Sequence, residues 1–274
     1  MTLQRKYEKL QSLFRKMGSV AVAYSGGVDS ALVLAVAHSV LNGKTLAVTG
    51  NSASLAQREL TAATNLAKTL GVAHHVIDTE EVATPEYAAN PVNRCYYCKS
   101  ELYSKLQEVA DQHHLKHIVN GTNVDDLGDH RPGLVSAREA NVRSPLCEAG
   151  ITKQDVRDLA RQLGLPVWDK PAMPCLASRI PYEQAVTPGK LAMIEQAEDF
   201  LISLGFRQMR VRHFGESARI ELLQEDLPRF YKENLFETVH KRFLEIGFKE
   251  MTVDSEGFRS GRLNEAVTTA TEGK

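Results

Sequence analysis

The chain has 274 residues, of which 33 are Lys or Arg and 34 are Asp or Glu, so its formal net charge at pH 7 is −1. This near-neutral balance disfavours nonspecific nucleic-acid binding as the main activity, because such binding depends on a basic surface. Hydrophobic residues make up 43% of the chain, which is typical of a folded globular protein and not of a disordered or fibrous one.

Residues 1–19 predict an amphipathic helix of mixed charge and not a signal peptide. The longest apolar stretch, around 31–37, is far shorter than the roughly 20 residues that span a bilayer. We therefore expect a cytoplasmic, enzyme-sized protein with no membrane partner.

From there to about residue 180, short apolar strands alternate with helices. The expected strands cover 20–24, 45–48, 74–77 and 117–119. The expected helices cover 29–39, 55–70, 99–114 and 153–163. Strands separated by helices of this length pair in parallel, so the pattern predicts an α/β fold with a doubly wound parallel sheet. Ligands of such sheets bind at the carboxyl ends of the strands.

After about residue 181 the pattern changes to that of a smaller α+β domain. The expected elements are helices over 188–204 and 227–245 and strands over 208–213, 218–222 and 250–254. Each helix ends in a Gly-Phe pair that leads into a strand. We place the two domains at 1–182 and 183–274, with a linker at about 180–187.

A glycine loop, Ser-Gly-Gly-Val-Asp-Ser at 25–30, follows the first strand and opens a helix. Gly26 and Gly27 permit a tight turn and leave room for bulky oxygens, while the amides of the first helical turn favour an anion. Ser25 and Ser30 add hydroxyl donors. Asp29 suits such a site if it accepts a loop amide or helps to hold Mg²⁺. The alternative is a structural strand–helix turn that is capped by serine.

The four cysteines lie at 95, 98, 147 and 175. In a reducing compartment a C-x-x-C pair favours metal or redox chemistry over a disulfide. With Cys147 as fourth ligand, the thiols fit a structural Zn²⁺ site. Without it, Cys95, Cys98 and Cys175 suit a [4Fe–4S] cluster with one open iron. Buried apolar thiols are the third possibility.

The string S-G-G-x-D-S resembles the PP-loop of the ATP-pyrophosphatases, a superfamily that includes GMP synthetase, NAD synthetase and the tRNA-thiolating enzymes. The resemblance implies that ATP is cleaved between its α- and β-phosphates, so that the substrate is adenylated and pyrophosphate leaves. The loop differs from the Walker loop, which ends in G-K-[ST].

Taken together, seven motifs make nearly the whole chain similar to the LarE family. They are SGGVDS at 25–30, CYYC at 95–98, NGTNVDD at 120–126, RPG at 131–133, TKQDVRDLA at 152–160, PCLASR at 174–179 and GFRSG at 257–261. The resemblance implies a sulfurtransferase that helps to build the nickel-pincer nucleotide cofactor of lactate racemase. Such enzymes adenylate a carboxylate of pyridinium-3,5-biscarboxylic acid mononucleotide with ATP and convert it to a thiocarboxylate. They form trimers or hexamers, so the resemblance also implies a homo-oligomer, to which the smaller domain contributes.

Two sulfur chemistries are known in this family. One branch sacrifices a cysteine, which becomes dehydroalanine, and here that residue would be Cys175. The other binds a [4Fe–4S] cluster through three cysteines, and its open iron holds a sulfide that a separate donor supplies. Because Cys95, Cys98 and Cys175 are all present, the chain resembles the second branch. Cys147 receives no role.

The remaining site residues are expected in two groups. The ATP and Mg²⁺ group comprises Ser25, Gly26, Gly27, Asp29, Ser30, Lys99, Gly121, Lys153 and Asp126, with Asp125 as the alternative to Asp126. The substrate group comprises Ser178, Arg179, Arg210, Arg212 and Arg259. Arg210 and Arg212 alternate along a strand and so share a face, where guanidinium groups suit a phosphate. The alternative readings are solvated lysines and a polar sheet face on which Arg210 pairs with Glu221.

Three rival functions remain at this point. A tRNA-thiolating enzyme combines the same loop with C-x-x-C chemistry, but it predicts a broad basic surface. An amidating synthetase has no need of CYYC. A non-catalytic carrier would use ATP only as a conformational ligand.

Overall fold

The computed structural model describes residues 1–128, 132–232 and 235–259. The chain divides into two compact units. The first consists of Met1–Glu81 and Asn93–Met173, and the second consists of Val82–Val92 and the chain from Pro174 onward. No helix in the described residues has the length and apolar character needed to cross a membrane.

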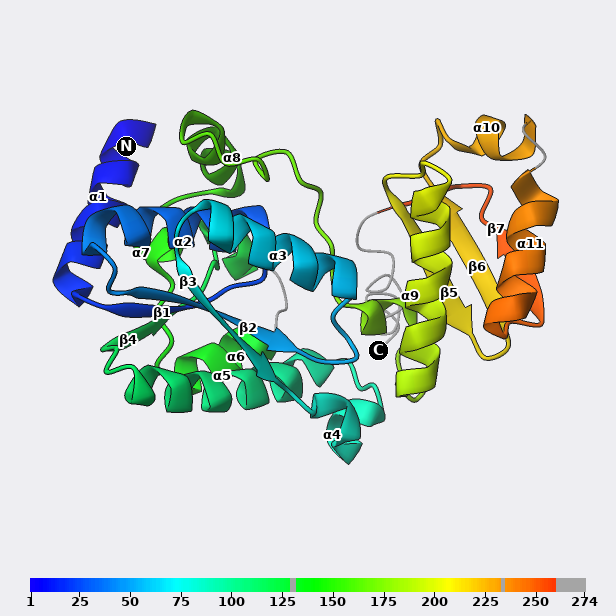
Figure 1. Cartoon of the computed structure of the whole chain (residues 1–274), viewed down its shortest axis with the longest axis horizontal. Helices are drawn as coiled ribbons and strands as arrows, with labels where there is room; N and C mark the ends of the chain where they lie inside the picture. Colours follow the sequence, from blue (N-terminus) through cyan, green and yellow to red (C-terminus); the bar gives the residue numbers. More distant parts are fainter. Residues whose placement is uncertain (129–131, 233–234, 260–274) are drawn as a thin grey trace, which may run out of the picture. The chain divides into compact units, whose positions relative to one another are not determined.

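The first unit is built on a four-stranded parallel sheet with the order β3-β2-β1-β4 (Figure 1). Its strands are β1 (Val20–Ala23), β2 (Thr45–Asn51), β3 (Ala73–Asp78) and β4 (His117–Val119). All four expected strands are present, which confirms the α/β fold class. The chain moves outward from β1 to β3 and then returns to the other side of β1, so the strand order reverses between β1 and β4. Ligands of open parallel sheets bind at this kind of switch point.

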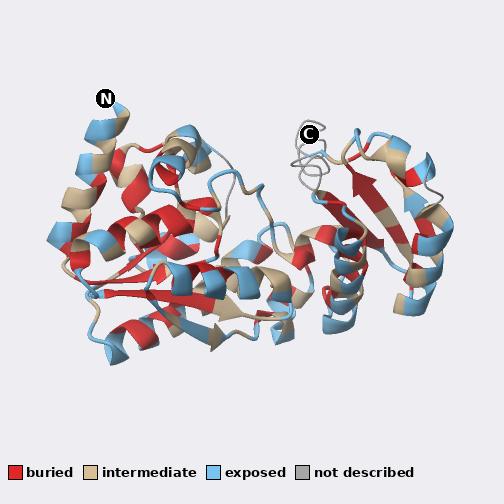
Figure 2. Cartoon of the chain, turned by 45° about the horizontal axis from the view of Figure 1, so that its top comes forward, coloured by how far each residue is buried: buried red, intermediate tan, exposed pale blue. Residues whose placement is uncertain are grey.

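Helices cover both faces of the sheet (Figure 1). One face carries α1 (Leu3–Met17), α2 (Val28–Leu41), α3 (Gln57–Thr69), α7 (Pro145–Ala149) and α8 (Lys153–Gln162). The other carries α5 (Arg94–Gln112) and α6 (Pro132–Glu139). Successive residues of β1 point to opposite faces, so Val20 and Val22 join the core under α2, whereas Ala21 joins the core under α5. The buried residues of Figure 2 follow these two layers.

Helix α5 begins at Arg94, five residues before the expected start at 99. Pro91 and Asn93 precede it and nothing within the CYYC segment breaks a helix, so the first turn forms over the cysteines. The structure also contains short elements that the sequence patterns did not indicate. They are α4 (Pro85–Ala88), the helices α6 and α7, and 3₁₀ turns at Glu81–Ala83, Val124–Gly128 and Leu176–Arg179.

The second unit has a three-stranded sheet with the order β5-β6-β7. Its elements are α9 (Pro188–Ser203), β5 (Met209–Phe214), β6 (Ser217–Leu222), α10 (Leu227–Lys232), α11 (Leu235–Ile246) and β7 (Glu250–Val253). Strands β5 and β6 form the expected antiparallel hairpin, and β7 pairs in parallel with β6. The single helix expected over 227–245 is two helices, α10 and α11, and residues 233–234 between them lie outside the described part of the chain.

Candidate functional site

The glycine loop follows β1 and ends where α2 begins at Val28. Gly26 has φ +70°, a backbone conformation that favours glycine. A Cβ atom at this position would lie 2.8 Å from the Cβ of Ala63 in α3, so the site also excludes a side chain by contact. The loop conformation therefore depends on glycine at 26 and on a small residue at 63.

The hydroxyl groups of Ser25 and Ser30 form hydrogen bonds inside the glycine loop. Ser30 Oγ donates to the Gly27 carbonyl (3.1 Å) and lies 3.2 Å from both the amide nitrogen and the Oγ of Ser25. Ser30 is buried and Ser25 is exposed. The first-turn N–H groups of a helix have no intrahelical acceptors, so the N-terminus of α2 presents donors beside the exposed Ser25 hydroxyl. This arrangement is suited to a phosphate group.

The loop after β4 packs directly against the start of α2. A Cβ atom on Gly121 would lie 2.7 Å from the Ser30 nitrogen and 3.0 Å from the Asp29 carbonyl carbon. Position 121 therefore requires glycine, because any side chain there would prevent the close approach of the loop after β4 to the start of α2. The two loops on either side of the β1–β4 switch point form one continuous surface.

Lys153, the first residue of α8, brings a third segment to this surface. Its Nζ forms an ion pair with Asp29 Oδ2, and its backbone N–H donates to Asp125 Oδ2 (2.7 Å). Asp126 Oδ2 accepts the backbone N–H of Asn123 (3.0 Å). The structure thus brings together Asp29, Lys153, Asp125 and Asp126 beside the glycine loop. The carboxylates of the three aspartates are hard oxygen ligands of the kind that Mg²⁺ prefers.

Cys95 and Cys98 lie in the first two turns of α5, three residues apart and therefore on one face of the helix. Cys95 is exposed and Cys98 is half-buried. Both belong to the first unit, whereas Cys175 is half-buried in the second. In the described residues, no group of three or more His, Cys, Asp or Glu side chains is placed to hold a metal ion.

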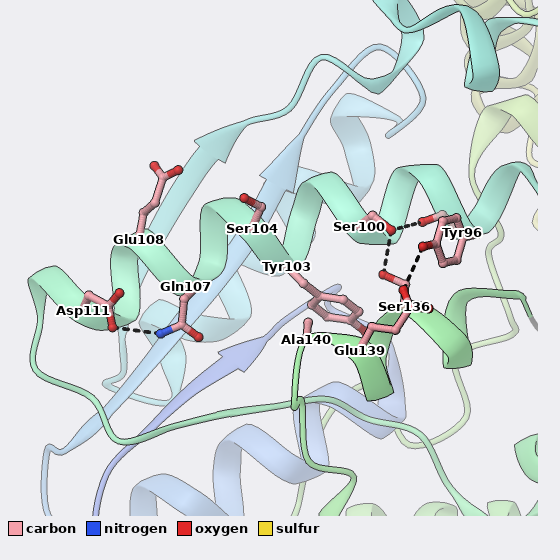
Figure 3. A pocket seen from close by; sticks show the side chains of 10 residues that line it. All are labelled: Tyr96, Ser100, Tyr103, Ser104, Gln107, Glu108, Asp111, Ser136, Glu139 and Ala140. Carbon is pink, nitrogen blue, oxygen red and sulfur yellow. Dashed lines mark hydrogen bonds between the residues drawn. The ribbon is translucent and has the colours of Figure 1, made fainter.

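The first turns of α5 are attached to α6 by polar contacts (Figure 3). The Tyr96 hydroxyl donates to Glu139 Oε2 (2.8 Å), and Ser100 Oγ contacts both the Tyr96 carbonyl (2.9 Å) and Ser136 Oγ (3.0 Å). Lys99, in the same part of α5, packs close to Gly133 of α6. A Cβ atom added to Gly133 would lie 3.1 Å from Lys99 Cγ. Helix α6 therefore fixes the turn that carries the cysteine pair. The neighbouring Arg131 lies outside the described residues.

In the second unit, Arg179 holds the turn that contains Cys175. Its Nη1 donates to the carbonyls of Pro174 (2.6 Å) and Cys175 (3.1 Å) and to Ser178 Oγ (3.0 Å). Its Nε and Nη2 donate to the two carboxylate oxygens of Glu198 at 2.8 and 3.0 Å. The Arg179 side chain is 1% exposed and that of Glu198 is fully buried.

Arg210 and Arg212 lie beside this pair on β5. Arg212 donates to Glu221 Oε2 from Nε (3.1 Å) and Nη2 (2.9 Å), and to the Ser178 carbonyl from Nη1 (2.8 Å). Arg210 stands opposite Glu221 in the strand register and lies over the Phe258 ring. Burial, and then the charge of Arg179, lower the pKa of Arg210 to about 10, so it stays cationic at neutral pH.

Three of the five expected substrate residues are thus arginines gathered in one buried cluster with Glu198 and Glu221, and Ser178 adjoins it through its carbonyl. Arg259 is exposed and pairs with Glu256 (2.5 Å). Ser260 and Gly261 of the same motif lie outside the described residues.

Cys147 lies in α7, next to the loop after β4. Its thiol donates to the Thr122 carbonyl (3.2 Å). Burial, followed by the charges of Asp126 and Glu148, raises the pKa of Cys147 to about 11. At neutral pH this residue is a protonated thiol, whereas metal ligands and nucleophiles are thiolates.

Cys147 is therefore expected to resist alkylation in the folded apoprotein. At pH 8 its reaction with iodoacetamide should be about 100-fold slower than that of an ordinary thiol, because the rate follows the thiolate fraction. The rate should rise about tenfold per pH unit toward pH 11 and should become ordinary in urea. Peptide mass spectrometry after timed labelling measures this, with exposed Cys95 as the internal reference. Labelling of Cys147 at equal rates in native buffer and in urea would contradict the assignment.

Comparison with known proteins agrees with this geometry. A family model described as NAD synthase matches residues 3–93, which include the glycine loop. An uncharacterized protein of Synechocystis is 44% identical over 97% of this chain and 99% of its own length. The pyridinium-3,5-bisthiocarboxylic acid mononucleotide synthase of Lactiplantibacillus plantarum is 37% identical over 98% of this chain and 97% of its own length.

A tRNA-specific 2-thiouridylase of Rickettsia africae is also similar, but only in part. It is 28% identical over 57% of this chain and 53% of its own length. The mononucleotide synthase, in contrast, is similar over almost its whole length. The chain therefore belongs to the family of that synthase, the LarE family of ATP-dependent sulfurtransferases in the PP-loop superfamily.

Proposed function

We propose that this enzyme adenylates a carboxylate of pyridinium-3,5-biscarboxylic acid mononucleotide and converts it to a thiocarboxylate, as a step in building the nickel-pincer nucleotide cofactor. The observation that carries the proposal is the glycine loop at the switch point, which presents the N-terminus of α2 and the Ser25 hydroxyl as donors. Gly121 of the neighbouring loop packs against the start of α2, and Lys153 pairs with Asp29 beside it. The end-to-end similarity to a synthase of the bisthiocarboxylic acid mononucleotide supports the choice of substrate.

The protein groups that we assign to the reacting phosphates in the activation step all belong to the first unit. A substrate carboxylate oxygen attacks the α-phosphorus of ATP, the bond to the β-phosphate breaks, and pyrophosphate leaves. The loop amides and the Ser25 hydroxyl bind the departing phosphates, and Lys153 neutralises their charge. Asp29 and Asp126 are the carboxylates assigned to Mg²⁺. The product is an acyl adenylate, whose acyl group no longer carries the negative charge that repels an anionic nucleophile.

The second step replaces AMP by sulfur. A sulfide attacks the acyl carbon and the bond to AMP breaks, which leaves a thiocarboxylate. We assign Cys95, Cys98 and Cys175 as the ligands of a [4Fe–4S] cluster, to which the C-x-x-C pair would contribute two thiolates from one helix face. When bound, such a cluster supplies sulfide at the iron that lacks a protein ligand. The alternative is that the Cys175 thiolate itself attacks the acyl carbon and AMP leaves. Loss of the Cα proton of Cys175 then breaks its Cβ–S bond, which releases the thiocarboxylate and leaves dehydroalanine.

The second unit supplies the remaining parts of this proposal. Its arginines, with Ser178 beside them, are assigned to the substrate's phosphate and second carboxylate, and exposed Arg259 is the residue best placed to move onto an anion. We also assign to this unit the contacts of a cytoplasmic homo-oligomer, a trimer or a hexamer. A separate sulfide donor completes the cycle.

The function is tested by anaerobic incubation of the enzyme with ATP, Mg²⁺, sulfide and pyridinium-3,5-biscarboxylic acid mononucleotide. AMP and pyrophosphate should appear in equal amounts, together with a product in which one oxygen has been replaced by sulfur. A parallel incubation with tRNA tests the rival that the partial 2-thiouridylase similarity suggests. Thiolated nucleoside in that arm, with no thiocarboxylate in the first, would refute the proposal.

The cluster assignment predicts about four irons per chain after anaerobic reconstitution. Cys95→Ser, Cys98→Ser and Cys175→Ser should each lose most of this iron, because each removes one of three thiolate ligands. Cys147→Ser should keep it and serves as the matched control. The mass of the wild-type chain should be unchanged after turnover, whereas loss of one sulfur from Cys175 would establish self-sacrifice instead.

A further inference from the structure

Asn123 is a buried residue that the proposed chemistry does not use. It follows β4 and is 1% exposed. Its side-chain Nδ2 donates to Asp29 Oδ1 (3.0 Å), and its Oδ1 accepts the backbone N–H of Asp125 (3.0 Å). One side chain therefore connects the loop after β4 to the aspartate of the glycine loop, across 94 positions of sequence.

These contacts belong to a closed ring of four residues. Asn123 bonds to Asp29 and to the Asp125 amide. Asp125 Oδ2 accepts the backbone N–H of Lys153 (2.7 Å), and Lys153 Nζ pairs with Asp29 Oδ2. The ring joins three segments, namely the glycine loop, the loop after β4 and the N-terminus of α8. It fixes the position of the Asp29 carboxylate from two sides.

The two oxygens of Asp29 have partners of different character. Oδ1 accepts from a neutral, buried amide, whereas Oδ2 faces an ammonium group whose side chain is 37% exposed. A divalent cation repels the ammonium but not the amide. The ammonium regains water when it leaves, while a buried amide that lost its acceptor would be left unsatisfied. Exchange at Oδ2 is therefore the less costly route.

We propose that Asn123 is a positioning residue that orients Asp29 for Mg²⁺, and that Asp29 exchanges Lys153, not Asn123, for the cation. This inference rests on the proposed function, in which Asp29 serves MgATP. The Asn123 bond holds Oδ1 throughout, so that Oδ2 faces the cation. Lys153 becomes available to the phosphates at the same moment, which couples cation binding to neutralisation of the nucleotide.

The test is calorimetry of ATP binding with and without Mg²⁺, in the absence of the carboxylate substrate. The quantity compared is the ratio of the two dissociation constants, which reports how much Mg²⁺ strengthens ATP binding. In Asn123→Ala this ratio should fall about tenfold, in line with the usual loss of metal affinity when a residue that orients a ligand is removed. A purely structural role would weaken binding equally in both conditions and leave the ratio unchanged.

Asn120→Ala is the matched control. Asn120 is 6% exposed in the same loop, and its Oδ1 accepts from Thr122 N (3.0 Å) and Ser144 Oγ (2.9 Å), away from Asp29. In Asn120→Ala the ratio of the two dissociation constants should equal that of the wild type. Should Asn123→Ala fail to fold, Asn123→Ser retains an oxygen for the Asp125 amide but is too short to reach Asp29, and the same tenfold fall is expected.

Two results would overturn the inference. One is a wild-type ratio in the folded Asn123 variants, and the other is an equal fall in Asn120→Ala. Wild-type protein that binds no ATP in either condition would instead refute the proposed function, so the two failures are distinguishable.

Discussion

Replacing Gly121 with alanine is expected to lower pyrophosphate release by about 100-fold or more while the chain remains folded. The new methyl group would lie 2.7 Å from the Ser30 nitrogen and 3.0 Å from the Asp29 carbonyl carbon, both of which are backbone atoms that cannot swing aside. The start of α2 must then move away from the loop after β4. A displacement of about 1 Å at a reacting centre costs on the order of 100-fold in rate.

Gly128→Ala provides the control for this prediction. It lies at the end of the same connection after β4, and a Cβ there would meet no atom of the described residues within 4 Å. Its pyrophosphate release should match that of the wild type, and both variants should retain the wild-type circular dichroism spectrum. Near-normal release by Gly121→Ala would show that the phosphates do not depend on the junction of these two loops.

Glu198→Ala is expected to destabilise the second unit by about 3–5 kcal/mol, the usual cost of removing one partner of a buried ion pair. Both carboxylate oxygens of Glu198 accept bonds from Arg179, and Oε1 also accepts the Val211 N–H (3.2 Å). The variant leaves the Arg179 cation buried without this carboxylate. Because Arg179 also bonds to the Pro174 and Cys175 carbonyls, the cysteine turn should loosen with it.

Urea denaturation of the apoprotein measures this effect, and Glu245→Ala is the matched control. Glu245 pairs with Arg242 at the surface (3.0 Å), and its side chain is 50% exposed. Such pairs contribute about 0–1 kcal/mol. Equal, small shifts of the unfolding midpoint in the two variants would mean that the buried Arg179–Glu198 pair contributes no more to stability than the surface pair does.

Local patterns in the sequence were sufficient to predict most of the first unit. The strand at His117–Val119 has the expected bounds, because three apolar or aromatic residues end at an Asn-Gly pair. Helix α8 begins at Lys153 as expected, since Thr152 and Asp155 form a capping box. The start of α5 was less predictable. A cysteine pair read as a metal motif gives no helical signal of its own, although its spacing also places both thiols on one face.

Contacts between distant segments could not be predicted in this way. The alternation of Arg210 and Arg212 indicates a shared strand face, but nothing local indicates that Glu198 and Glu221 lie beside the cluster. The ring through Asn123 also joins three separate segments, so no local pattern predicts its contacts. The only local signal was an Asn that follows Gly-Thr after a strand, which also fits an ordinary turn.

The way the chain passes between its two units limits how the protein can be dissected. It leaves the first unit after Glu81, re-enters it at Asn93 and leaves again after Met173. Within this excursion, the Asn90 side chain donates to the carbonyls of Pro181 (2.7 Å) and Gln184 (3.0 Å), and Val186 N–H donates to the Ala88 carbonyl (2.8 Å). A fragment truncated at 173 would keep these eleven residues, which include the buried Tyr87, but would lose the rest of the unit to which they belong. Independent expression of the first unit therefore requires Glu81 to be joined to Asn93 by a short designed linker, and that of the second unit requires Val92 to be joined to Pro174, because no single cut separates the two units.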